Sequence, residues 1–210
     1  NIAIGKDKGA PPPPGKGKGK GSPDVPPPTA LMDAASYVQQ LNKQMDDPNQ
    51  TAKNLKDLDN FLGGKGDNAK RKEFANENGI HAVLTAGANH AQNTHVQRGM
   101  CAVLFNLART SDNRRKIAEE GGINQILAAM NEHTGDAEVQ EKACAALYNL
   151  ALDDNNKQLI VKENGIRHIL DAMNKHAGEA GVQEEACWAL SKLAANNADN
   201  KQLIVKENGI

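Results

Sequence analysis

The chain has 210 residues, of which 24% are charged and only 3% are aromatic, and its formal net charge is −1. No apolar run approaches the roughly 18 residues needed to span a bilayer, and residues 1–30 lack the apolar core of a secretory signal. These features exclude membrane-spanning and secreted classes, so we expect a soluble intracellular protein, cytoplasmic or nuclear.

Residues 1–30 have a biased composition, with eight of the nine prolines and six of the nineteen glycines. Such a segment buries too little apolar surface to offset the entropy lost on ordering, so we expect a disordered Pro/Gly/Lys-rich tail. Its five lysines and two aspartates give it a net charge of +3, which leaves −4 for the rest of the chain. The lysines could contact an anionic surface and Pro11–Pro14 could bind a polyproline-recognition domain, although a solvated linker is the simpler interpretation.

Residues 31–66 are expected to form a degenerate N-terminal helical unit. The segment from Leu31 to Met45 supplies an amphipathic helix. A second apolar stripe follows it and aligns with a stripe in the next unit if one loop is three residues longer. The stripe consists of Leu55, Leu58, Phe61 and Leu62, which match Cys101, Leu104, Leu107 and Ala108.

An internal repeat dominates the rest of the chain. Gly-Ile recurs with its glycine at positions 79, 122, 165 and 209, so the steps are 43, 43 and 44 residues. Val-Gln recurs at 96, 139 and 182, and the three cysteines keep the same spacing. The segment NKQLIVKENGI at 156–166 appears again, unchanged, at 200–210. Independent markers with one period indicate stacked copies of a single structural unit.

Each unit contains three helices. In residues 112–154, Ile123, Ile126, Leu127 and Met130 have helical spacing, a polar break follows at Thr134–Asp136, and a longer stripe begins at Val139. A shorter helix at about Lys157–Lys162 precedes Gly165, and we expect this glycine to make the reversal by entering positive φ. One unit cannot bury both stripes alone, so neighbouring units must stack.

The repeat boundaries follow from these markers. We expect repeat 1 at 67–111, repeat 2 at 112–154, repeat 3 at 155–198, and the first helix of a truncated repeat at 199–210. The chain begins with Asn1 instead of Met and ends inside a unit, so we interpret it as a fragment of a longer protein. The apolar face of the last long helix should then be exposed.

The segments NKQLIVKENGIRHILDAM and VQEEACWALSKLAANNADNKQLIVKENGI resemble the armadillo repeat of the importin-α, β-catenin and vacuolar-protein type, over about residues 68–210. The resemblance implies an all-α, right-handed α-solenoid whose third helices line a concave groove. Such solenoids act as protein–protein interaction scaffolds, so we expect an extended peptide or a partner helix in that groove.

Helical spacing defines the stripe of the third helices that should face this groove. Its candidate binding residues are Arg98, Phe105, Asn106 and Arg109 in repeat 1, Glu141, Tyr148 and Asn149 in repeat 2, Glu184, Trp188 and Lys192 in repeat 3, and Asn60 in the degenerate unit.

The resemblance implies that Asn60, Asn106 and Asn149 form a ladder that bonds to the main chain of the peptide. An amide suits this role because it both donates and accepts, although these asparagines could instead bond to a neighbouring loop or to water. Phe105, Tyr148 and Trp188 are candidate aromatic anchors. The alternatives are packing for Phe105 and exposure through truncation for Trp188.

The importin pattern places Trp and, four residues later, Asn in the same unit. Repeats 1 and 2 have the asparagine with Ala102 or Ala145, and repeat 3 has Trp188 with Lys192. A pocket for nuclear-import signals is therefore disfavoured.

No pattern indicates catalysis, a metal or a cofactor. Cys101, Cys144 and Cys187 lie too far apart on stacked helices to form disulfides, so we expect small buried packing residues. For the same reason the three recurring histidines cannot share a metal, and helix C-terminal carbonyls should bind them, with a pH-sensing row as the alternative. Those histidines are His90, His133 and His176. The sequence GGKG at 63–66 lacks the spacing of a P-loop and is expected to be a flexible loop.

We therefore expect a non-enzymatic scaffold without cofactors. Its partner should be a protein or peptide; nucleic acid is not expected, and the oligomeric state stays open. Three alternatives remain: the substrate-targeting arm of a larger enzyme such as a ubiquitin ligase, an importin-like transport adaptor, and a structural solenoid that binds by its outer face.

Overall fold

The structure is a computed structural model that describes residues 32–208, so the expected tail at 1–30 lies outside the described residues. Between residues 32 and 208 the chain forms helices and no strand. No helix in this range is both long and apolar enough to cross a membrane. The helices are α1 (Ala34–Lys43), α2 (Pro48–Leu62), α3 (Asn68–Asn76), α4 (Gly79–Asn89), α5 (Thr94–Leu107), α6 (Ser111–Glu119), α7 (Gly122–Glu132), α8 (Ala137–Leu150), α9 (Asp154–Lys162), α10 (Gly165–Lys175), α11 (Ala180–Ala194) and α12 (Ala198–Asn208).

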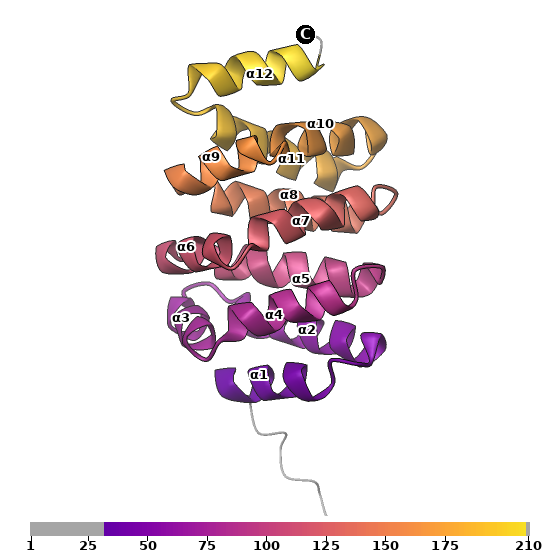
Figure 1. Cartoon of the computed structure of the whole chain (residues 1–210), viewed down its shortest axis with the longest axis vertical. Coiled ribbons are helices and arrows are strands. Elements are labelled where there is room, and N and C mark those ends of the chain that lie inside the picture. The colour runs from indigo at the N-terminus through magenta and orange to yellow at the C-terminus, as the bar shows by residue number, and fades with distance from the viewer. Residues whose placement is uncertain (1–31, 209–210) are drawn as a thin grey trace, which may run out of the picture. The chain divides into compact units, whose positions relative to one another are not determined.

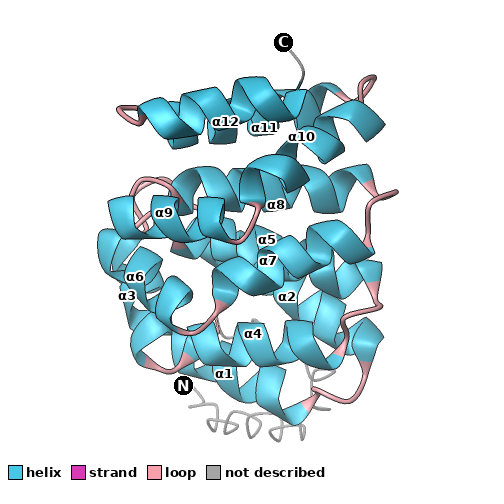
Figure 2. Cartoon of the chain, turned by 45° about the horizontal axis from the view of Figure 1, so that its top comes forward, coloured by secondary structure: helices cyan, strands magenta, loops and turns pink. Residues whose placement is uncertain are grey.

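The helices stack in three columns along the long axis of this region (Figure 1). The first helices of the units, α3, α6 and α9, form one column along an edge that is clearest in Figure 2. The second helices are α1, α4, α7 and α10, and the third helices are α2, α5, α8 and α11. The degenerate unit thus has a second and a third helix, α1 and α2, and the repeats have all three.

A single hydrophobic core runs through all the units. Leu104 of α5 and Leu147 of α8 are fully buried in it. The expected packing role of the cysteines is correct for Cys101 and Cys144, which are buried, and wrong for Cys187, which is exposed. Cys187 lies on the face of α11 that no further third helix covers within the described region.

The recurring Gly-Ile glycine has a different role from the one the sequence suggested. The residues at positive φ are the ones before it, Asn78 at 59°, Gly121 at 81° and Asn164 at 61°. Gly122 itself begins α7, and a Cβ at this position would lie 2.5 Å from Ile117 Cγ2. Glycine is therefore required because the second helix starts against an apolar side chain of the first helix.

The glutamines of the Val-Gln pairs connect the second helix of each unit to the third by hydrogen bonds. Gln140 Nε2 donates to Met130 O at 2.9 Å and to His133 O at 3.0 Å. Gln97 and Gln183 make the equivalent pairs of bonds in their own units. Each glutamine satisfies carbonyl groups that the last turn of a helix leaves without intrahelical donors.

The recurring histidines join one unit to the next. Each is the C-cap residue of its second helix, as the sequence indicated, and its Nε2 donates to a main-chain carbonyl just beyond the second helix of the preceding unit. The bonds are His90 to Met45 O at 2.6 Å, His133 to Ala91 O at 2.8 Å and His176 to Thr134 O at 2.8 Å. Asn156 Nδ2 makes an analogous bond to Arg114 O, 3.0 Å away, between two first helices.

The last helix, α12, departs from the column of first helices. It repeats the sequence of α9 but packs on α10 and α11. The connection before it contains extended Ala195 and Asn196 at φ 56°. Consequently Asn200, the counterpart of Asn156, donates to Leu193 O at 2.8 Å instead of to the preceding first helix.

Candidate peptide-binding groove

The third helices α2, α5 and α8 enclose a hollow of about 650 Å³ at the N-terminal end of their stack. All the lining residues come from α2, α5 and α8. Arg98 and the small residue Ala102, both in the predicted stripe, are among them. The predicted stripe and the lining of the hollow therefore share residues on α5, whereas the α8 residues of the lining, Glu138 and Lys142, lie outside the predicted stripe.

Small residues form the floor of this hollow. Ala52 of α2 and Gly99 and Ala102 of α5 line it. At Gly99 a Cβ would lie only 2.8 Å from Leu55 Cβ, so α2 and α5 approach more closely than a larger residue would allow. The surface of α5 is therefore recessed at this point, and the longer side chains of α2 and α8 form the walls of the hollow on either side.

The cationic side chains that line the hollow differ in whether a carboxylate lies within ion-pair distance of them. Arg98 Nη1 lies 2.6 Å from Glu138 Oε2 and its Nη2 lies 3.3 Å from Asp136 Oδ2. Lys142 Nζ lies 2.7 Å from Glu141 Oε1. Lys53 and Lys56 of α2 are exposed and have no ion-pair partner within 4.0 Å among the described residues.

The two central asparagines bond to neighbouring third helices. Asn106 Nδ2 donates to Asp59 Oδ1 at 2.7 Å, and Asn149 Nδ2 donates to Phe105 O at 3.0 Å. They are only 6% and 7% exposed. Both bonds run to neighbouring third helices, a kind of partner that neither interpretation of the sequence named, and each uses one N–H of the amide. Asn106 Oδ1 also accepts from Arg109 Nη1 at 3.5 Å, and the remaining amide atoms stay candidates for a peptide. Asn60, the third member of the expected ladder, is exposed.

Asp59 is the carboxylate of the α2 wall. Burial raises its pKa, while the hydrogen bond from Asn106 and the charge of Lys142 act in the opposite direction. Arg109, another predicted residue, is exposed at the end of α5, where its Nη1 donates to Gly63 O at 3.4 Å.

Aromatic side chains occupy the other end of the stripe. Trp188 of α11 is 53% exposed, and its ring centroid lies 6.2 Å from that of half-buried Tyr148 on α8. Lys192 Nζ lies 5.9 Å from the centroid of the Tyr148 ring. Phe105 is half-buried and packs against the core. Of the three predicted anchors, Trp188 is thus the most accessible.

Carboxylates lie beside this aromatic pair. Burial raises the pKa of Glu185 on α11, and the charges of Glu141 and Glu184 raise it further, with a smaller opposing effect from Lys142. Glu184 is exposed and Glu141 is half-buried against Lys142. The C-terminal end of the groove is therefore more acidic than the α2 wall.

Sequence reasoning missed Lys53, Lys56 and Asp59 of α2. The signal was present, because the same 46-residue offset that aligns Asn60 with Asn106 also aligns Lys56 with Ala102. Lys56 therefore takes the central groove position, which Ala102, Ala145 and Trp188 occupy in the three repeats.

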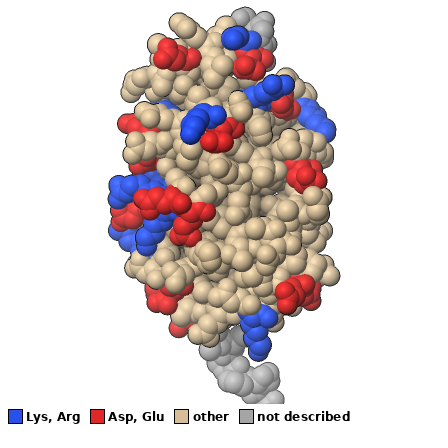
Figure 3. Space-filling model, viewed as in Figure 1, with Lys and Arg blue, Asp and Glu red and all other residues tan. Residues whose placement is uncertain are grey.

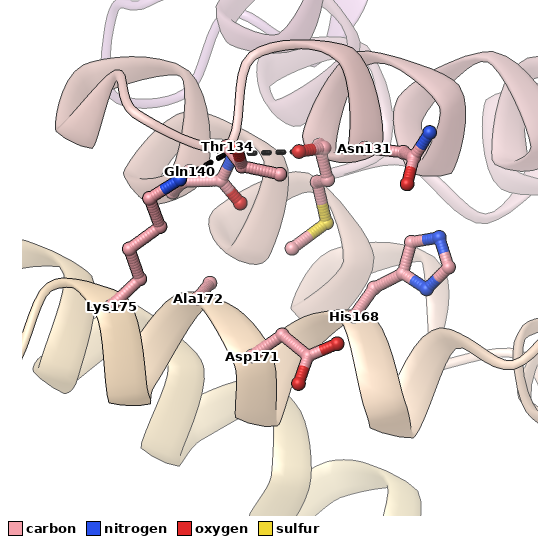
Figure 4. Close-up of a pocket in the computed structure, with 8 residues that line it drawn as sticks. Asn131, Thr134, Gln140, His168, Asp171, Ala172 and Lys175 are labelled. Atoms are coloured by element: carbon pink, nitrogen blue, oxygen red, sulfur yellow. Dashed lines mark hydrogen bonds between the residues drawn. The ribbon is translucent and has the colours of Figure 1, made fainter.

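The outer side of the stack contains a smaller pocket of about 270 Å³ between α7 and α10 (Figure 4). His168, Asp171 and Lys175 of α10 line it, and Lys175 Nζ donates to Thr134 Oγ1 at 2.8 Å. An equivalent pocket of about 190 Å³ lies one unit earlier, and each of its lining residues is 43 positions before its counterpart. The counterparts of His168, Asp171 and Lys175 there are Gln125, Ala128 and Glu132, so the hollow recurs with the repeat while its polar lining does not.

Figure 3 shows the face on which the second helices lie, with few charges over α4 and α7 and a cluster of charged side chains at the edge near α6.

Residues 32–208 contain no group of three or more His, Cys, Asp or Glu placed to hold a metal ion.

Stacked three-helix units with a continuous face of third helices define an α-solenoid, a class that uses its concave surface for recognition. Residues 110–152 and 153–195 match the Armadillo/beta-catenin-like repeat family. Residues 110–195 therefore carry two armadillo repeats, which are consecutive units of the stack.

A solved structure with a similar fold is the crystal structure of an engineered protein from the Northeast Structural Genomics Consortium. It has a TM-score of 0.73 and 22% sequence identity, over 85% of this chain and 69% of that one. This similarity supports the fold alone. A comparison with curated proteins found no match. Armadillo solenoids generally serve as scaffolds for protein interaction and are typically not catalytic.

Proposed function

We propose that the stripe of α2, α5, α8 and α11 binds an extended peptide or a helix of a partner protein, and that the chain acts by recognition alone. The observation that carries this proposal is the exposure of Trp188 on the same stripe as the hollow. Aromatic residues dominate the binding energy at many protein interfaces, and a large exposed aromatic side chain on this stripe marks a surface that a partner can cover.

The predicted residues have different roles in this proposal. Trp188 and Tyr148 contact apolar side chains of the partner, while Asn60, Asn106 and Asn149 offer their remaining amide groups to its main chain. Arg98, Arg109, Glu141, Glu184 and Lys192 set the charge pattern. Phe105 supports Asn149 through its carbonyl group.

Site-specific photo-cross-linking tests the proposal. Benzoylphenylalanine would replace Trp188, an aromatic exchange at an exposed site, or the exposed Ala128 on the outer helix α7 as the matched control. We expect a protein segment to be cross-linked from position 188 and not from 128, and Tyr148→Ala to reduce the yield. Cross-links from position 128 alone would place the binding surface on the outer face and refute the proposal.

The intrinsic fluorescence provides a second measurement, because Trp188 is the only tryptophan of the chain. Acrylamide should quench it readily in the free protein, since the side chain is about half exposed. A partner bound in the groove should reduce this quenching. Unchanged quenching with a bound partner would count against the groove.

A further inference from the structure

We infer that the hollow between α2, α5 and α8 receives an acidic segment of the partner protein, with one of its aliphatic side chains inserted over the alanine and glycine floor. This inference rests on the proposed groove function and adds the chemical class of the ligand. It commits to a peptide whose carboxylates face the α2 wall.

The first step in the argument is the state of the two lysines of α2. Lys53 and Lys56 line the hollow, and no carboxylate of residues 32–208 lies within ion-pair distance of either. Arg98 of α5 and Lys142 of α8 are already paired. The two unpaired charges therefore belong to one wall.

The second step is charge complementarity. Residues 31–210 have a net charge of −4, yet the lining of the hollow contains four cationic side chains and two carboxylates. One of these carboxylates, Glu138, pairs with Arg98, and the other, Asp59, accepts its hydrogen bond from Asn106. The hollow is thus a locally positive surface on an acidic domain, and such a contrast selects an acidic partner.

The third step is the position of Lys56. At the corresponding place the repeats have Ala102, Ala145 and Trp188, so Lys56 is the only charge on the central line of the groove. A carboxylate bound there would lie beside the low floor formed by Ala52 and Ala102. An aliphatic side chain next to that carboxylate would fill the floor, as anchors do in peptide-binding grooves.

The geometry also sets the length of the peptide. Packed helices lie about 8–10 Å apart, so three adjacent third helices span roughly 20 Å between the outer axes. An extended chain advances about 3.3 Å per residue and would cross this distance with about six residues. A peptide of about ten residues therefore covers the hollow with a margin at each end.

The experiment measures the binding of three fluorescein-labelled peptides to the whole chain by anisotropy. All have one central leucine in a Gly/Ser background, flanked by glutamates, by glutamines or by lysines. We expect the Glu peptide to bind at least tenfold more tightly than the Gln peptide, and the Lys peptide to bind most weakly. Replacing the leucine by glycine should weaken the Glu peptide several-fold.

Charge reversal on the protein locates the site. Lys53→Glu with Lys56→Glu should weaken the Glu peptide more than tenfold, whereas Lys162→Glu with Lys201→Glu changes the net charge equally at exposed sites of α9 and α12 and should change affinity less than twofold. Thermal melts should be similar for both double variants, because all four lysines are exposed.

Three outcomes would overturn the inference: equal binding of the Glu and Gln peptides, preference for the Lys peptide, or equal weakening by both double variants, which would indicate general charge attraction. Absence of binding by all three peptides would overturn it as well. None of these results decides the proposed function, because cross-linking from position 188 tests that independently at the other end of the groove.

Discussion

The glutamine that joins the second and third helices offers a sharp test of the repeat architecture. Gln140 is 2% exposed and donates to Met130 O and His133 O. His133 O also accepts the Asp136 N–H at 3.0 Å, whereas Met130 O lies in the last turn of α7, where carbonyls lack intrahelical donors. Gln140→Leu would therefore remove two bonds and leave a buried carbonyl without a donor.

The expected cost follows from these contacts. A net hydrogen bond contributes about 1 kcal/mol, and a buried polar group left without a partner costs about 1–3 kcal/mol. Leucine recovers part of this by burying apolar surface. We therefore expect Gln140→Leu to lower the free energy of unfolding by about 2–3 kcal/mol.

Gln140→Glu adds a dependence on pH. Its carboxylate would point at two carbonyl oxygens in a buried site, so its pKa in the folded state should lie above the value of about 4.3 in the unfolded chain. The folded state then binds more protons than the unfolded state, and stability falls as pH rises between these two pKa values. The loss relative to wild type should be small near pH 4 and large at pH 7.

Urea denaturation monitored by circular dichroism at both pH values measures these effects. Gln158→Leu, on the exposed side of α9, is the matched control and should change stability by less than about 0.5 kcal/mol. If Gln140→Leu behaved like this control, or if the Gln140→Glu variant showed no added dependence on pH, the role assigned to the glutamine would be wrong.

Three further predictions concern the core, the cysteines and the acidic end of the groove. Leu147→Ala should cost about 3 kcal/mol in urea melts, whereas Leu152→Ala, 42% exposed in the wild type, should cost under about 0.5 kcal/mol. In the native protein only Cys187 should react with iodoacetamide in peptide mass spectra, because burial raises the pKa of Cys101 to about 12 and thiolate is the reactive form. Glu185→Gln should raise the free energy of unfolding in urea melts at pH 7 and not near pH 4, because burial and neighbouring carboxylates destabilise the ionised form of Glu185 and so raise its pKa. Equal effects at both pH values would contradict this.

The three-helix unit could be predicted because its signals are local. Apolar spacing located α7 and α8, and the break at Thr134–Asp136 falls between them. The short third-repeat helix was expected at Lys157–Lys162 and begins earlier, at Asp154, because the side chain of Asp153 caps it by accepting the N–H groups of Asn155 and Asn156. The predicted role of the Gly-Ile glycine, a reversal at positive φ, was wrong. The glycine is required by its close contact with a side chain of the preceding helix, and such a contact between helices cannot be read from apolar periodicity.

The groove could be predicted only in part. Register along each helix placed Arg98 and Trp188 on one stripe, since side-chain direction follows from helical geometry, and in the structure Arg98 lines the hollow and Trp188 is exposed. The bond from Asn106 to Asp59 depends on the approach of α5 to α2, and no spacing within a single unit contains that distance. Lys56 takes the place of an alanine or a tryptophan in the repeats, so a match of residue type between units does not indicate it.

A comparison of helices α9 and α12 shows that local sequence determines the formation of a helix but not its position in the stack. The segment NKQLIVK is identical in both and helical in both, so local propensity and pattern suffice to specify the helix. In α9, Ile160 is fully buried and Asn156 bonds to the preceding first helix, whereas in α12 the equivalent Ile204 is half-buried and Asn200 bonds to α11. The connections before α9 and α12 have equal length, but α11 is one residue longer than α8, and the connection that follows it contains extended Ala195 and Asn196 at φ 56°, so the chain leaves α11 in a different direction. The position of a helix in the solenoid is therefore set by the loop before it and by the neighbours that it meets.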